Sequence, residues 1–521
     1  MTRINSNIPS VIAQANLAKT NNELEMRLQR LSTGLRINRA ADDPTGLIIS
    51  ERLRSEIQGN EQGVKNSERT SSVIATAEGA LAEVNDLLNS IKALVVEAAN
   101  TGAFSEAEIE ANQRQIDSAI ESITRISNTA SFGGLKLLNG SLDYTLSGLD
   151  TSTISTARVG GASFIGEASL EVDVDVVASA QTASLYIRGD LPTPGAPENG
   201  TILSTTNLRI AGPRGVIELQ FVSATPYADM AAAINKVSAL TGVEAALINN
   251  DATSGLVFRS ELYGSAQFVS VERTNGPTDS SLNTFSTYSI TNNGAVPGPP
   301  FPWADIGTFL TINNRDEGKD VVALINGALA SSKGLMVSVR SPLLSVEILL
   351  TAAFATDPTL TSSAFNITGG GALFQLGSQV TSQQQANLGI PSVAASLLGG
   401  TLTDGQLQFL SSLRTGEANS LAKSNSRKDF SVTSDVLEAS IDQVSVLRGT
   451  LGAFERNVIQ TNVRSLQAAY ENLAASMSRI RDADFAFETS QLTRSQILTS
   501  AGTSVLALAN QQSQQVLQLL G

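Results

Sequence analysis

Both ends of the 521-residue chain carry apolar residues at alternating steps of three and four. This spacing keeps one face of an α-helix apolar, and over several heptads it predicts long helices packed as coiled coils. In the first hundred residues the seam positions are Leu24, Leu28, Leu31, Leu35, Leu81, Val84, Leu88, Ile91 and Val95. Near the other end they are Leu447, Leu451, Phe454, Leu466, Leu473, Ile497, Val505 and Leu508.

The seam of the C-terminal part consists of two apolar stripes that differ in phase by one residue. The first stripe is Val444, Leu447, Leu451, Phe454 and Val458, and the second is Ile459, Val463, Leu466, Tyr470, Leu473, Met477 and Ile480. We assign both stripes to one helix that begins near Asp435 and runs to about Ile480. At 1.5 Å per residue, such a helix is roughly 70 Å long, and a rod of that length needs other helices as partners.

Capping and turn residues mark where the N-terminal helices begin and end. Asp43 followed by Pro44 predicts the start of a helix that continues to about Asn100. Ser131-Phe132-Gly133-Gly134 ends the helical pattern, and Asn139-Gly140 is a turn signal that predicts a hairpin. The outermost segments, 1–40 and 485–521, are rich in uncharged polar residues around one narrow apolar stripe. We hypothesise that they are disordered in the monomer and become helical in an assembly.

The middle of the chain has a different composition from the two ends. Of the 15 prolines, 13 fall within residues 141–410, where turns and strands are therefore expected. Asn326-Gly327 predicts a hairpin turn, and Asn207 to Arg273 predicts a hairpin, a helix that starts near Thr225-Pro226, and further strands. The predicted fold class is a mainly α, long-helix coiled-coil bundle formed by both chain ends, with an inserted β-rich (α+β) central region.

Composition excludes several kinds of chemistry. The chain contains neither cysteine nor histidine, which removes Ser-His-Asp and Cys-His catalysis and the common zinc ligand sets. The net charge is −14, of which −3 belongs to residues 1–140, none to 411–521 and −11 to the middle. An acidic surface argues against a nucleic-acid partner. We therefore expect no catalytic, cofactor or metal site.

The chain also lacks the sequence features of membrane insertion. No stretch of 18 apolar residues is present, so we expect no transmembrane helix. The N-terminal residues lack the basic and then apolar run of a secretory signal peptide. This is expected of a cytosolic protein, and equally of a protein exported by a route that needs no such signal.

Two groups of residues resemble the signatures of bacterial flagellins. The first is Leu31-Ser32-Thr33-Gly34-Leu35-Arg36-Ile37-Asn38 followed by Ala41-Asp42-Asp43, with Glu78-Gly79-Ala80-Leu81 and the segment Asn128 to Leu138 further along. The second is Ser478-Arg479-Ile480-Arg481-Asp482-Ala483-Asp484-Phe485 with Gln496-Ile497-Leu498 and the segment Ala501 to Ala507. The similarity covers both ends, about half of the chain.

The resemblance implies a filament subunit with three layers. Residues 1–43 and 482–521 would form the inner tube of a flagellar filament, and residues 44–175 and 405–481 a helical shell with a β-hairpin region. Residues 176–404 would project outward, and about 207–273 resembles a small module of flagellin and hook proteins. The resemblance further implies self-polymerisation, secretion through the flagellar type III apparatus, an export chaperone on the C-terminal helix, and contact with filament cap and hook–filament junction proteins.

One departure from the family pattern concerns an innate immune receptor. Recognised flagellins are held by a Toll-like receptor on the shell helix, a region that corresponds to Leu88, Ser90, Leu94 and Glu97. Recognised members carry an arginine where this chain has Ser90, and often a glutamine where it has Glu97. We therefore expect weak or no activation; the alternative is that Ser90 is an ordinary solvent-facing substitution.

Two other functions remain as alternatives. The hook–filament junction protein of the same axial family shares amphipathic terminal helices, although the C-terminal signature is much closer to that of a filament subunit. An adhesive surface filament, with the middle region as the adhesin, is compatible with a filament role.

Overall fold

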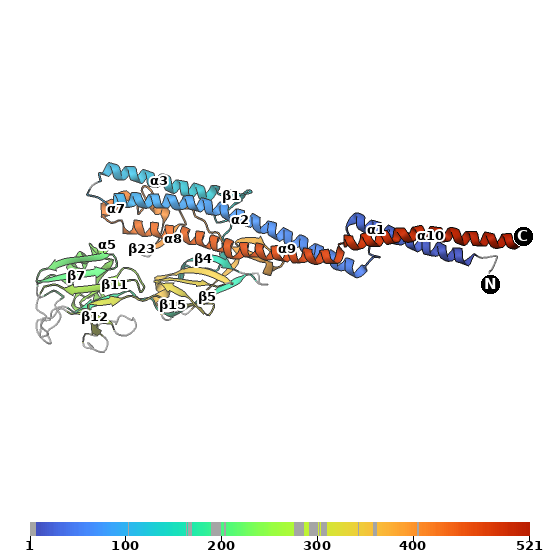
Figure 1. Cartoon of the computed structure of the whole chain (residues 1–521). Helices are drawn as coiled ribbons and strands as arrows, with labels where there is room; N and C mark the ends of the chain where they lie inside the picture. The colour runs from blue at the N-terminus through green and yellow to red at the C-terminus, as the bar shows by residue number, and fades with distance from the viewer. Residues whose placement is uncertain are drawn as a thin grey trace. The chain divides into compact units, whose positions relative to one another are not determined.

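The computed structural model describes residues 7–102, 104–162, 164, 169–188, 200–202, 205–275, 286–290, 301, 303, 310–341, 343–357, 362–403 and 406–520. The chain forms two compact units. The end unit comprises Met1–Ser71, Gln375–Gln385 and Glu455–Gly521, and the body unit comprises Ser72–Phe374 and Ala386–Phe454. The predicted fold class, long helices from both chain ends with an inserted β-rich region, is confirmed (Figure 1).

Local capping explains where the helices of the end unit begin and end. Helix α1 is Ile8–Thr33; its first turn is capped by the Asn7 side chain, and it ends at Gly34 in a left-handed conformation, φ 72°. Helix α2, Pro44–Ala98, starts where predicted, because an Asp43 carboxylate oxygen accepts a hydrogen bond from Gly46 N at 2.8 Å. The remaining helices of this unit are α9, Gln460–Arg481, and α10, Phe485–Leu520.

A loop from the middle of the sequence also belongs to the end unit. Strands β21, Ala372–Gln375, and β22, Gln385–Leu388, form a two-stranded sheet, and the residues between them include the short 3-10 helix η4, Ser382–Gln384. Asn462 of α9 donates a hydrogen bond to the Leu376 carbonyl at 2.8 Å. The loop therefore packs against α9 in a contact that spans 86 residues of sequence.

The body unit contains the remaining helices and a short hairpin. Its long helices are α3 (Glu106–Thr129), α8 (Ser431–Phe454) and the part of α2 that begins at Ser72. Two shorter helices, η5 (Leu410–Leu413) and α7 (Leu421–Arg427), also belong to it. The hairpin is β1 (Ser131–Phe132) and β2 (Leu135–Lys136), joined by Gly133 and Gly134 at positive φ. The prediction that Asn139-Gly140 opens a hairpin is wrong, because the strand that follows, β3 (Tyr144–Ser147), pairs with the distant β20 (Ser362–Gly370).

The single C-terminal helix predicted from Asp435 to Ile480 is interrupted. Helix α8 begins slightly earlier, at Ser431, and ends at Phe454. One π turn, η6 (Glu455–Ile459), separates it from α9. The two apolar stripes that differ in phase by one residue therefore lie in two α-helices joined by a π turn.

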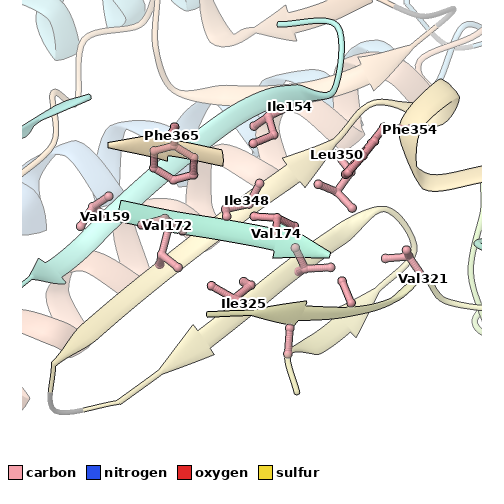
Figure 2. Close-up of a cluster of buried hydrophobic side chains, with 14 of the residues drawn as sticks. Ile154, Val159, Val172, Val174, Val321, Ile325, Ile348, Leu350, Phe354 and Phe365 are labelled. Atoms are coloured by element: carbon pink, nitrogen blue, oxygen red, sulfur yellow. The ribbon is translucent and has the colours of Figure 1, made fainter. Parts of the chain in front are cut away.

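A β-sandwich holds one apolar core of the body unit. Its first sheet has the order β16-β15-β5-β20-β3 and its second β17-β18-β19-β4. Alternate residues of both sheets, among them Val172, Val174, Ile348 and Phe365, point into one shared cluster (Figure 2). The other strand bounds are β4 Ile154–Ala162, β5 Leu170–Ala178, β15 Val322–Ile325, β16 Ala328–Leu329, β17 Ser331–Lys333, β18 Met336–Arg340 and β19 Leu344–Leu350. The short α6, Ala352–Thr356, contributes Phe354.

The predicted hairpin turn at Asn326-Gly327 is confirmed within this sandwich. Strands β15 and β16 flank it, and both turn residues have positive φ, 49° and 75°. Asparagine and glycine are the residues that adopt this conformation at least cost. The Asn326 amide also bonds to the backbone of β5 through the Glu171 carbonyl and the Asp173 amide.

The predicted hairpin–helix–strand module forms a second β region. It contains β7 (Thr206–Gly212), β8 (Gly215–Phe221), α4 (Tyr227–Asn235), α5 (Ser238–Thr241), β9 (Val243–Leu247), η1 (Ile248–Asn250), η2 (Ala252–Ser254), β10 (Leu256–Ser260) and β11 (Phe268–Arg273). Strands β6 (Ser184–Ile187), β12 (Thr287–Ile290), β13 (Leu310–Ile312) and β14 (Arg315–Glu317) complete its two sheets. Helix α4 starts one residue later than predicted, because the Thr225 hydroxyl donates to the Val222 carbonyl instead of capping the helix.

A last hairpin leads back to the helices of the body unit. It consists of β23, Gly399–Thr403, and β24, Gln406–Phe409. The Gln443 side chain of α8 accepts a hydrogen bond from Gly399 N at 3.1 Å. The hairpin is therefore attached to α8 through the start of its first strand.

Candidate assembly site at the paired chain ends

The first and last long helices of the chain pair within the end unit. Asn7 at the start of α1 donates a hydrogen bond to the Ala509 carbonyl at 3.1 Å, across 502 residues of sequence. Ser10 donates to the Asn510 side chain at 2.8 Å. Figure 1 shows α1 and α10 side by side. Because the start of α1 lies beside residues late in α10, the two helices run antiparallel.

A buried carboxylate joins the other end of the same helix pair. The Glu488 side chain of α10 is 3% exposed, and its two oxygens accept hydrogen bonds from Arg27 at 2.8 Å and Arg30 at 3.2 Å. Both arginines belong to α1, and one helical turn separates them. A carboxylate this deeply buried is stable only when it is paired, so the cluster fixes the register of α1 against α10.

The two sequence signatures meet where the paired helices end. Arg36 N donates to the Arg481 carbonyl at 2.7 Å, and Ala483 N donates to the Gly34 carbonyl at 2.9 Å. Leu35 and Asp482 form an isolated antiparallel bridge between these bonds. The two signatures, which lie at opposite ends of the sequence, therefore build one structural joint.

The elbow between α1 and α2, residues 34–43, is held by its own side chains. One Asp42 carboxylate oxygen accepts from Asn38 N at 3.0 Å and from Arg39 N at 2.9 Å. These backbone hydrogen bonds hold the pKa of Asp42 below its usual value. Ile37 is 1% exposed and anchors the elbow, while Arg481 of α9 reaches Glu51 of α2 at 2.9 Å.

The end unit leaves much of its apolar surface in solvent. Of the predicted seam residues of this unit, Leu24, Leu31, Leu35, Leu466 and Leu473 are half-buried, whereas Leu28, Ile497, Val505 and Leu508 are exposed by 49, 63, 56 and 58%. Further exposed apolar residues of α1, α2 and α10 are Ile8, Val11, Ile12, Ile48, Ile49, Phe485, Phe487 and Leu498. Exposed apolar surface of this kind is typical of sites that bind other proteins, membranes or ligands.

All but one of the predicted seam residues of the body unit are buried, unlike those of the end unit. Leu81, Val84, Leu88, Ile91, Val95, Leu447 and Leu451 are buried, and Phe454 is half-buried. They form the interior of the single subunit. In the predicted receptor region, Leu88 therefore offers no exposed surface, Leu94 is half-buried, and Ser90 and Glu97 are exposed.

The sequence prediction missed the Glu488 cluster. A signal was available, because Glu488 is the only acidic residue after Asp484, in a segment whose only other charge is Arg494. A lone charge in an amphipathic helix predicts a specific partner. Arg27 and Arg30, three residues apart near the first signature, are the matching cations.

The described residues offer neither a metal-binding cluster nor a membrane-spanning helix. Among the described residues, no group of three or more acidic side chains is placed to hold a metal ion. No helix within the described ranges has the length and apolarity that a bilayer span requires.

Paired terminal helices with uncovered apolar stripes define a class of protein, the self-assembling filament subunit. Three family models match the chain: the bacterial flagellin N-terminal helical region over residues 4–143, the bacterial flagellin C-terminal helical region over 434–520, and the flagellin hook IN motif over 205–261. The chain belongs to the bacterial flagellin family, a family of structural proteins that form the flagellar filament.

Curated relatives match over the whole length of the chain. It is 28% identical to the flagellin of Salmonella choleraesuis and 29% identical to the B-type flagellin of Pseudomonas aeruginosa, with 99% of both chains covered in each comparison. The flagellin of Bacillus subtilis is 43% identical over 139 residues, which are 26% of this chain and 46% of that protein.

Proposed function

We propose that the protein is a non-enzymatic subunit that polymerises through its end unit, where neighbouring copies cover the exposed stripes of α1 and α10. One observation carries this proposal. Large apolar residues of α10 such as Ile497 and Val505 are more than half exposed in the single chain. Each such residue, when fully buried against a partner, contributes about 1.5–3 kcal/mol. Several of them per subunit are sufficient to drive polymerisation.

The resemblance to flagellins supplies the arrangement that we propose for the assembly. Residues 1–43 and 482–521 line the inner tube, residues 44–175 and 405–481 form the shell, and residues 176–404 project into solvent. The acidic surplus of the middle region supports its outward position, because near-neutral ends pack closely and a charged exterior stays soluble. The location is the extracellular flagellum.

The partners belong to the same assembly route. They are further copies of the chain, an export chaperone on α10, and the filament cap and hook–filament junction proteins. The chaperone covers the apolar stripe of the uncharged C-terminal tail until the exported subunit assembles. Nucleic acid and membrane insertion have no part in this function.

Seeded polymerisation of two pairs of exposed substitutions tests the proposal. Val505→Ser with Leu508→Ser removes apolar surface from α10, where the residues are 56 and 58% exposed. Val177→Ser with Leu329→Ser is the matched control, since these body-unit residues are 61 and 70% exposed. Neither pair lies in a folded core, so both monomers should fold normally.

Electron microscopy after seeding distinguishes the two pairs. The α10 pair should give no filaments, and the control pair should polymerise as the unsubstituted protein does. Normal filaments from the α10 pair would overturn the proposal. Loss of filaments in both pairs would also contradict it, because assembly would then depend on apolar surface outside the end unit.

A further inference from the structure

The one-residue phase shift of the C-terminal seam coincides with the π turn η6. Backbone hydrogen bonds of a π turn join residues five apart instead of four, so the turn accommodates one additional residue. That residue equals the one-residue difference in phase between the two stripes. Leu451 before the turn is fully buried, and Val463 and Leu466 after it are half-buried.

Two adjacent apolar residues in the turn are alternatives for one seam position. Val458 continues the stripe of Leu451 and Phe454, whereas Ile459 begins the stripe of Val463. In the structure Ile459 is 1% exposed and Val458 is 38% exposed. The π turn could instead lie one turn later, after Ile459. Val458 would then take the buried position, and Ile459 would face solvent.

The residues on either side restrict the π turn to these two positions. The first stripe, continued beyond Val458, would bring Thr461 and then Ser465 into the seam. The second stripe, continued backward from Ile459, would bring in Arg456 and Gly452. Burial of an arginine or a hydroxyl without a partner is unfavourable, so neither stripe can extend by more than one turn.

One contact stabilises the present position. Ser71 of α2 donates a hydrogen bond to a Glu455 carboxylate oxygen at 2.6 Å, at the first residue of the π turn. The division of the chain into two compact units falls at the same place, between Phe454 and Glu455 on this segment and between Ser71 and Ser72 on α2.

We propose that η6 is a two-position switch in which Val458 and Ile459 exchange as the buried seam residue. The helix stays continuous and the flanking stripes keep their places, while the side chain presented to solvent changes. The switch belongs to the single chain, so it holds or fails independently of the proposed polymerisation.

Cysteine labelling of the full-length monomer tests the switch. The chain has no cysteine, so Ile459→Cys introduces a unique thiol at a buried position. Maleimide then reacts through the second position of the turn, in which residue 459 is exposed. Adding Val458→Asp blocks that position, because it would bury a carboxylate, and the labelling rate should fall about tenfold.

A matched substitution serves as the control for charge and helix propensity. Val446→Asp adds the same charge at an α8 residue that is 49% exposed and lies outside the turn, and it should leave the labelling rate of Ile459→Cys unchanged. An unchanged or higher rate with Val458→Asp would overturn the proposal, since local unfolding of the helix would then be the route to the thiol.

Single-residue deletions give a second test that does not depend on labelling. Deletion of Asn457 removes the additional residue and leaves both stripes in phase along an uninterrupted α-helix, so the monomer should keep its unfolding temperature. Deletion of Gln467, an exposed residue of α9, moves the rest of the second stripe out of phase and should lower that temperature. Equal losses from the two deletions would contradict the proposal.

Discussion

Glu488 of α10 joins the two chain ends through ion pairs with two arginines of α1. Its carboxylate is 3% exposed and satisfies two arginines that are themselves mostly buried. Glu488→Gln removes the charge and leaves two cations facing one amide. We expect the pairing of α1 with α10 to lose about 2 kcal/mol, the scale for hydrogen bonds to charged groups.

Amide hydrogen exchange in α1 and α10 of the assembled filament, where these helices are expected to be protected, measures this loss. The matched control is Glu61→Gln, because the Glu61–Lys65 pair of α2 lies on the surface with both side chains more than half exposed. An exposed pair of this kind contributes little, so exchange should stay unchanged in the control. Equal exchange rates in the two variants would show that the cluster does not hold the helices together.

Asp42 makes the elbow between α1 and α2 sensitive to acid. Its pKa lies below the usual 3.8 because Arg39 N and Asn38 N donate to the ionised carboxylate. The stabilisation is therefore fully present above pH 3.8 and is lost as the pH falls through the lowered pKa of the folded state. An NMR titration should show the Asn38 and Arg39 amides shifting below that pH, with no such transition in Asp42→Asn. Shifts of the same size in the variant would exclude Asp42 as the cause.

Ser90 is the residue expected to limit activation of the Toll-like receptor. It is exposed on α2, one turn from the half-buried Leu94, so a receptor that binds this surface would meet a hydroxyl where recognised flagellins offer a guanidinium. A reporter-cell assay should give weak activation by this protein and stronger activation by Ser90→Arg. Full potency of the unsubstituted protein would contradict this expectation.

Alanine substitutions at Gly63 and Gly79 of α2 test how closely this helix packs against its neighbours. A Cβ at Gly63 would lie 2.9 Å from the Leu466 side chain and 3.0 Å from the Leu376 carbonyl, whereas nothing lies within 4 Å at Gly79. Gly63→Ala should destabilise the monomer by about 1–3 kcal/mol through overpacking. Gly79→Ala should stabilise it by about 0.5–1 kcal/mol through helix propensity.

Urea unfolding of the two variants provides the comparison. Opposite shifts of the midpoint are expected, because the helix propensity term is the same at both positions and the close contact with the 376–384 loop exists at only one. A stabilising effect of both substitutions would mean that the loop does not pack on α2 in solution.

The elements that sequence could predict are those with local causes. The start of α2 follows from Asp43-Pro44, and the β15–β16 turn follows from Asn326-Gly327, since each depends on neighbouring residues. The packing of the 376–384 loop against Gly63 depends on residues more than 300 positions apart, and no local pattern encodes it. The π turn is an intermediate case. The one-residue phase shift between the two apolar stripes was visible in the sequence, but the sequence did not show that a π turn absorbs it.

The residues of the assembly site also differ in whether the local sequence can predict their role. Heptad spacing identified the seam residues, but the same spacing describes Leu88, which is buried in the subunit, and Val505, which is exposed. Only the three-dimensional partners decide which stripe is an interior and which is an interface. The Glu488 cluster was missed because charge pairs across about 460 residues leave no periodic signal.

The whole molecule consists of a body unit with its own cores and an end unit whose apolar stripes are incomplete. The body unit buries Leu81, Leu451 and the β-sandwich cluster within one chain. The end unit pairs α1 with α10 but leaves one side of each helix uncovered. Two helices with such narrow buried seams are marginal in water, so polymerisation and ordering of the ends should be coupled.

Amide hydrogen exchange of monomer and filament, compared residue by residue, tests this coupling most directly. We expect amides of α1 and α10 to exchange rapidly in the monomer and to become protected in the filament, while α3 and the sandwich strands are protected in both. Terminal helices that are equally protected in the monomer and in the filament would show that assembly does not order the chain ends.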